Sequence, residues 1–290
     1  MTEEGKGFVF HASDGDVELT FDQVSELAES GDPDGLYALA MAYLFGWDVE
    51  TDEARGYGLL ERAVEAGQTE AMVLMVRLFM QGEYDGIDSV RAAEYSIRAA
   101  QDSIPDAQLY AGLAYMDGVS VPQDHSEAAR YFRLAANQGN AEARTNLAYL
   151  YQEGLGVERD EVKAFKLYRT AAKTGNLNAL FHLGICHEFG IGTRIDTVMA
   201  ADCYSKGAEG GDAFATERLG FLHSQGIGGS EPDAEASFEC FLSAAMEGVP
   251  TAMAMVSHCY RNGVGVDADP DEADKWARMA SDNGVDADSL

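Results

Sequence analysis

The sequence lacks a long hydrophobic run and a signal peptide. No uninterrupted apolar stretch approaches the roughly 18 residues that cross a membrane, and the segment from Met1 to Lys6 has neither a basic nor an apolar region. These absences predict a soluble, cytoplasmic protein without a membrane partner.

Closely spaced cysteines are also missing. Four cysteines lie between Cys186 and Cys259 without a CxxC pair, whereas structural zinc sites and secreted disulfide scaffolds use paired or regularly spaced cysteines. No P-loop is present, and the GxG triplets do not follow strands, so nucleotide binding is not expected. We therefore expect four free thiols and no cofactor.

Basic residues are scarce. The chain has 20 lysines and arginines against 50 aspartates and glutamates, a formal net charge of −30 at pH 7. Such a surface repels nucleic-acid phosphates and anionic lipids, which excludes both as partners and leaves basic proteins or cations. A second interpretation is that the acidity keeps an extended chain soluble or suits a saline cytosol. Both interpretations stay open at this point.

Glycine, by contrast, recurs with a fixed period. Glycines of a first series fall 36 residues apart or twice that, with one step of 37, and Ser103 stands at the one position of this series that lacks glycine. A glycine of a second series follows fifteen residues after each residue of the first except Gly284. Glycine tolerates the positive φ common just after a helix, so both series predict helix C-termini. The first series is Gly31, Gly67, Gly139, Gly175, Gly211, Gly248 and Gly284, and the second is Gly46, Gly82, Gly118, Gly154, Gly190, Gly226 and Gly263.

An aspartate lies fifteen residues before Ser103 and before each glycine of the first series from Gly67 onward, and predicts the start of a helix. An aspartate N-cap accepts hydrogen bonds from unpaired backbone N–H groups and contributes about 1 kcal/mol. Each repeat thus contains a helix A and a helix B, and helix A has an aromatic residue or histidine four residues after an apolar one. The caps are Asp52, Asp88, Asp124, Asp160, Asp196, Asp233 and Asp269, and the aromatic position holds Tyr43, Phe79, Tyr115, Tyr151, His187, His223 and Tyr260.

Repeat 4 contains the whole set of features together. They are Ala143, Leu147, Ala148, Tyr151, the run Gly154-Leu155-Gly156-Val157, Asp160, Ala164, Leu167, Tyr168, Ala171, Ala172 and Gly175. In this pattern the chain resembles the Sel1-like repeat family, which is related to tetratricopeptide repeats. The resemblance implies an all-α, right-handed superhelical α/α solenoid. It also implies a non-enzymatic adaptor or scaffold that binds other proteins.

The register also predicts the domain organisation. Residues 1–19 form an extension, residues 20–31 an N-terminal capping helix, and residues 32–284 seven repeats, followed by an acidic tail at 285–290 without a capping helix. Self-association through the last repeat is therefore an alternative function. Asp48, Tyr84 and Ser120 replace the second loop glycine in repeats 1 to 3, which predicts remodelled turns. The repeats are 32–67, 68–103, 104–139, 140–175, 176–211, 212–248 and 249–284.

A histidine and cysteine cluster offers an enzymatic or metal-binding alternative. His182 and Cys186 have the i, i+4 spacing of two ligands, with His187 and His223 nearby in register. His187 and His223 occupy the aromatic position of the repeat, however, and Cys186 occupies a small apolar position. We therefore expect these side chains to be structural, without a metal and without catalysis.

The remaining feature is a second apolar stripe on helix A, opposite its core stripe. An inner face that binds nothing should be polar, yet this one is apolar and rich in methionine in repeats 1 to 3. We expect a protein or peptide with basic flanks on this concave surface, rimmed by acids such as Asp34, Glu70, Asp106, Asp117 and Glu142. The alternative is that neighbouring repeats bury the stripe. The partner-binding residues are Tyr37, Met41, Leu44, Val73, Arg77, Met80, Leu109, Leu113, Met116, Tyr149, Phe181, Ile185 and Phe221.

Repeat 4 is the exception to the acidity. Arg144, Arg159, Lys163, Lys166, Arg169 and Lys173 slightly outnumber its acids. A solvated face of helix B explains them, and a docking patch for an acidic segment of another copy is the alternative.

Overall fold

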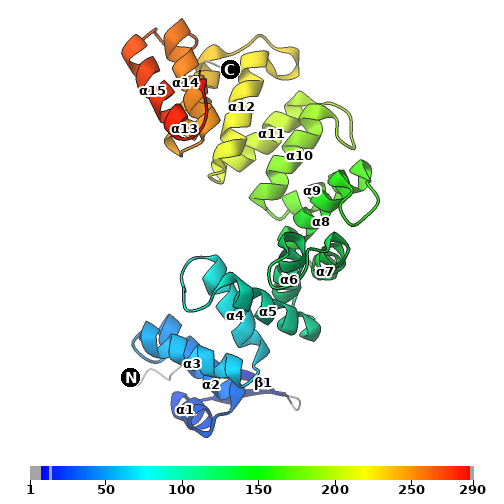
Figure 1. Cartoon of the computed structure of the whole chain (residues 1–290), viewed down its shortest axis with the longest axis vertical. Coiled ribbons are helices and arrows are strands. Elements are labelled where there is room, and N and C mark those ends of the chain that lie inside the picture. Colours follow the sequence, from blue (N-terminus) through cyan, green and yellow to red (C-terminus); the bar gives the residue numbers. More distant parts are fainter. Residues whose placement is uncertain (1–7, 13–14, 288–290) are drawn as a thin grey trace, which may run out of the picture. The chain divides into compact units, whose positions relative to one another are not determined.

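The computed structural model describes residues 8–12 and 15–287, and the fold within this range is an all-α solenoid of helix pairs preceded by one short β-hairpin. The chain forms two compact units, residues 1–138 (unit 1) and residues 139–290 (unit 2). In Figure 1 the two helices of a pair lie side by side, and helix B of one pair also contacts helix A of the next pair within its unit. None of the helices in the described range is long and apolar enough to cross a membrane.

Unit 1 begins with a short hairpin and the predicted capping helix. Strands β1 (Phe8–Ala12) and β2 (Gly15–Leu19) are antiparallel, so part of the extension is ordered into a sheet. Helix α1 (Phe21–Ser30) starts at a capping box, in which Thr20 and Gln23 exchange side-chain and backbone hydrogen bonds. Val24 and Ala28 are buried against the following helices. The capping helix is thereby confirmed.

Three helix pairs complete unit 1. They are α2 (Pro33–Phe45) with α3 (Glu53–Glu65), α4 (Thr69–Met80) with α5 (Ser89–Ala99), and α6 (Pro105–Asp117) with α7 (His125–Asn137). A 3-10 turn, Ala100–Asp102, follows α5. The first helix of each pair is helix A and the second is helix B of a repeat.

Unit 2 contains four more pairs. They are α8 (Ala141–Glu153) with α9 (Glu161–Ala172), α10 (Leu177–Phe189) with α11 (Thr197–Glu209), α12 (Ala213–Gln225) with α13 (Ala234–Met246), and α14 (Pro250–Asn262) with α15 (Pro270–Asp282). A 3-10 turn, Ile227–Gly229, separates α12 from α13. The seven pairs correspond to the seven repeats that the glycine period predicts.

The repeated polar residues act as the register requires. Each of the seven aspartates caps its helix B, with the side chain accepting from a backbone N–H of the first turn. All fourteen glycines of the two series have positive φ. Ser103, which stands where the other repeats have glycine, has φ 61° and ends the 3-10 turn after α5 in the same left-handed conformation.

The loop between helix A and helix B explains where a second glycine is needed. A Cβ atom on Gly192 would lie 2.0 Å from the carbonyl oxygen of Glu161, and one on Gly265 would lie 1.9 Å from that of Ala234. The loop therefore touches the start of helix B in the preceding repeat. Asp48 and Ser120 keep the same positive φ, at 54° and 64°. The expected remodelling is thus wrong for repeats 1 and 3.

The core repeats a pairing of small with large side chains. A Cβ atom on Gly112 in α6 would lie 2.5 Å from the Phe132 ring in α7, so this close approach needs a glycine. Gly184 and Tyr204 form the same pair in repeat 5, and Gly220 meets Phe241 in repeat 6. The small residue of helix A thus makes room for a large, fully buried residue of helix B.

The C-terminal end of unit 2 is partly covered. Val285 and Ala287 pack against the core cluster that contains Phe238 and Trp276. The predicted uncapped edge is therefore smaller than its sequence implies, although no helix follows α15 as far as Ala287. The last three residues of the predicted acidic tail, 288–290, lie outside the described range, as do residues 1–7 of the extension.

Candidate protein-interaction surface

The predicted stripe on helix A separates into buried and accessible positions. Each helix A contributes three positions to the stripe, and the first of them along the helix mostly faces the core. Val73 and Leu109, at this first position, are only 8% and 3% exposed, and Tyr37 is half-buried. Burial, then the neighbouring Glu70, raises the pKa of the Tyr37 hydroxyl. Val73 and Leu109 therefore serve the packing of unit 1 and are not accessible to a partner.

The other two positions of the stripe stay accessible in unit 1. Met80 is 55% exposed, Arg77 is exposed, and the remaining members are half-buried with part of each side chain reaching the surface. The flexible, unbranched side chain of methionine adapts to varied partner surfaces. We name these accessible residues the A-helix face; in unit 1 they are Met41, Leu44, Arg77, Met80, Leu113 and Met116.

In unit 2 the stripe contributes more to the protein's own core. Phe181 and Ile185 pack against the core cluster around Tyr204, and the Phe221 ring lies 4.9 Å from the Phe241 ring. Tyr149 is the member that is most open, at 40% exposure. Within the predicted stripe, unit 2 therefore presents fewer accessible apolar groups than unit 1 does.

Carboxylates lie beside the A-helix face in unit 1. Buried Gln68 donates to Asp34 Oδ1 at 3.3 Å and to Glu70 Oε2 at 2.6 Å, which links a predicted acid in the first turn of α2 to one in the first turn of α4. Asp117, at the end of α6, is exposed and lines a pocket. Gln68 thus holds two acids at the helix starts, and Asp117 lies exposed at the end of α6.

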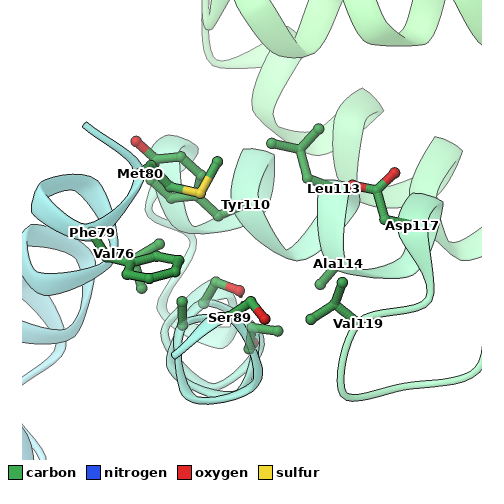
Figure 2. A pocket seen from close by; sticks show the side chains of 12 residues that line it. Val76, Phe79, Met80, Ser89, Tyr110, Leu113, Ala114, Asp117 and Val119 are labelled. Carbon is green, nitrogen blue, oxygen red and sulfur yellow. Dashed lines mark hydrogen bonds between the residues drawn. The ribbon is translucent and has the colours of Figure 1, made fainter. Parts of the chain in front are cut away.

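A pocket of about 170 Å³ opens between α4, α5 and α6. Figure 2 shows side chains from the three helices around it, with Val76 and Phe79 from α4, Ser89 from α5, and Leu113 and Asp117 from α6. Met80 and Leu113 belong both to this pocket and to the A-helix face. The lining is Val76, Phe79, Met80, Ser89, Ala92, Ala93, Ser96, Tyr110, Leu113, Ala114, Asp117 and Val119.

The pocket results from an exception in the repeat register. The large position of helix B holds fully buried side chains in five repeats, but in repeat 2 it holds Ser96, opposite Val76 on helix A, and in repeat 7 it holds Ala277. Repeat 2 thus reverses the small and large members of the pair, and no ring fills the space that Phe132 fills in repeat 3. The five large residues are Leu60, Phe132, Tyr168, Tyr204 and Phe241. The sequence contained this exception, but the stripe alone does not point to it.

The histidines and cysteines are held separately by packing. The His182 ring stacks on Tyr168 at 5.0 Å, and the His187 ring meets Phe165 edge-on at 5.3 Å. Burial raises the pKa of Cys186 to about 12, which keeps this thiol protonated and weakly nucleophilic. Within residues 8–12 and 15–287, no group of three or more His, Cys, Asp or Glu side chains is placed to hold a metal ion.

Comparisons with known proteins identify the repeat. The Sel1 repeat model matches residues 33–68, 105–140, 141–176, 177–212, 213–249 and 250–285. The segment between the first two matches folds as α4 and α5, so the unmatched repeat is the one with the reversed pair.

Two solved structures share the fold over most of the chain. One is c5321, a protective antigen of uropathogenic Escherichia coli, at 29% identity and a TM-score of 0.74, covering 92% of this chain and 57% of its own. The other is a Sel1 repeat protein from Oxalobacter formigenes, at 26% identity and a TM-score of 0.71, covering 91% of this chain and 76% of its own. The chain thus spans little more than half of the first structure. A comparison with curated proteins found no match.

Proposed function

The chain belongs to the Sel1 repeat family, and from this premise we propose that it is a non-enzymatic adaptor that holds a segment of a partner protein on the A-helix face of unit 1. Sel1 repeat proteins generally mediate protein–protein interactions. The observation that carries the proposal is the accessible, methionine-rich surface of α2, α4 and α6, with Met80 more than half exposed.

Charge supports a basic partner segment. Unit 1 contains 26 of the 50 acidic residues and 8 of the 20 basic ones, and Asp34, Glu70 and Asp117 lie beside the apolar groups. Complementary charge speeds association and favours one class of partner over others. The segment that we propose therefore has apolar anchors and basic flanks.

We also place the adaptor in the cytoplasm. All four cysteines are free, and Cys186, Cys203 and Cys259 are buried as small apolar side chains. Free cysteines are typical of reducing compartments, whereas proteins of oxidising compartments commonly form disulfides.

Capture of partners by a surface variant tests the proposal. Met41→Asp with Met116→Asp places two charges on the A-helix face outside the pocket, and this variant should lose the specific partners that the unchanged protein captures. The control is Leu134→Asp, because Leu134 is 39% exposed on α7, which is a helix B. Equal recovery of the same proteins by all three forms, measured by quantitative mass spectrometry, would refute the proposed face.

A further inference from the structure

We infer that the pocket between α4, α5 and α6 receives one aromatic side chain from a basic segment of the partner protein. This inference rests on the proposed function and names the anchor residue of that interaction. The partner's ring would occupy the place that the protein's own ring fills in repeats 3 to 6, because repeat 2 has Ser96 there.

The volume fits a single ring. The pocket holds about 170 Å³, and an engineered apolar cavity of about 150 Å³ in another protein binds benzene. A two-ring indole needs more space than this, so phenylalanine is the preferred anchor. Leucine has a similar bulk but lacks the flat ring that an S–aromatic contact uses.

The walls of the pocket are suited to a ring. Val76, Phe79 and Leu113 give apolar contacts, and Met80, which is 55% exposed, adds its thioether to the lining. Ser96 also lines the pocket, is 1% exposed and donates its hydroxyl to the Ala93 carbonyl at 2.8 Å. Its donor is therefore already satisfied, and an apolar group can approach it without breaking a hydrogen bond.

The charge at the pocket favours a cation next to the ring. Asp117 is the charged side chain of the lining and is exposed. No ion pair to Asp117 is found in the described part of the chain. Glu61, by contrast, already accepts a hydrogen bond from the Tyr84 hydroxyl. A lysine or arginine adjacent to the partner's aromatic residue would meet this carboxylate at the edge of the pocket.

Short peptides test the inference directly. The probes are acetyl-Lys-Phe-Lys-amide and acetyl-Lys-Ala-Lys-amide, and the readout is the NMR shift of the Met80 methyl group. The phenylalanine peptide should shift this methyl saturably, and the alanine peptide should bind at least about 30-fold more weakly, as expected for loss of a hot-spot ring. Indistinguishable titrations of the two peptides would overturn the inference.

A variant that fills the pocket provides the matching control on the protein. Val76→Ala with Ser96→Phe recreates the small and large pair of the other repeats, and it should abolish the Met80 shift while the fold is retained. If that variant unfolds, Val76→Ala with Ser96→Leu recreates the pair of repeat 1, Ala40 with Leu60. Asp117→Asn should weaken the phenylalanine peptide and reduce its salt dependence, whereas Glu65→Gln on α3 should do neither. Undiminished peptide binding by a folded, filled variant would also overturn the inference.

The capture assay separates the two proposals. If the filled variant still captures the partners while Met41→Asp with Met116→Asp does not, the pocket is not the anchor and the proposed function stands. If all forms capture equally, the proposed function fails, whatever the peptides do.

Discussion

Replacing Tyr168 by phenylalanine is expected to stabilise unit 2. Tyr168 is fully buried in α9, and no residue in the described range accepts or donates a hydrogen bond at its hydroxyl. Burial also raises the pKa of this hydroxyl, a consequence of its lost hydration. An unpaired buried polar group costs about 1–3 kcal/mol, so Tyr168→Phe should raise the free energy of unfolding by roughly 1 kcal/mol. Phe132 and Phe241 occupy the same position in repeats 3 and 6, which shows that the repeat accommodates this ring.

Tyr204 supplies a matched control with the opposite sign. It occupies the same position in repeat 5, but its hydroxyl donates to Glu188 Oε2 at 2.7 Å, and Glu188 also pairs with Arg218. Tyr204→Phe removes a hydrogen bond to a charged acceptor, which should lower the free energy of unfolding by about 1.5–3 kcal/mol. The two substitutions delete the same atom, so only its surroundings differ.

Urea unfolding followed by tryptophan fluorescence measures both effects. The chain has two tryptophans, and Trp276 is 8% exposed in unit 2, whereas Trp47 is 47% exposed in unit 1. A Trp47→Phe background therefore makes the signal specific for unit 2. The midpoint should rise for Tyr168→Phe and fall for Tyr204→Phe, with an unchanged slope. A fall of similar size for both would refute the reasoning from hydrogen bonding.

Two further predictions concern the loops and the thiols. Gly192→Ala should destabilise unit 2 by at least about 1–2 kcal/mol in urea unfolding, because φ is +65° and the new Cβ meets the Glu161 carbonyl. Gly58→Ala lies in open space within α3 and should instead stabilise unit 1 by about 0.5–1 kcal/mol. Equal effects of the two substitutions on the free energy of unfolding would contradict this prediction. Burial raises the pKa of Cys186 from 9.0 to about 12, so the folded state keeps a proton that the unfolded state loses, and stability should fall as pH rises above about 9. Cys186→Ala should reduce this alkaline loss in a pH series of unfolding curves, and an unaltered pH profile would count against it.

The repeat register could be predicted because each residue in it acts locally. An aspartate caps the helix that follows it, and a glycine ends the helix before it, so neither needs information from distant parts of the chain. The same register correctly gave His187 and Cys186 a packing role. Ser103 shows the limit of residue identity, since it adopts the left-handed conformation that glycine adopts elsewhere.

The candidate surface was predicted less completely, because burial depends on neighbouring repeats. Val73, Met80 and Leu109 are all apolar and share one stripe, yet two are buried and one is 55% exposed. Helical periodicity gives the direction of a side chain around its own axis, but not whether another helix covers it.

The sequence by itself determined the helix pairs, their caps and ends, the core stripe and the acidic surface, because these follow from periodicity and local hydrogen bonding. Only the tertiary structure decided which apolar groups remain accessible and where a pocket forms. The pocket at Ser96 depends on what faces that residue across the helix interface, and the volume left between α4, α5 and α6 is a property of three packed helices together.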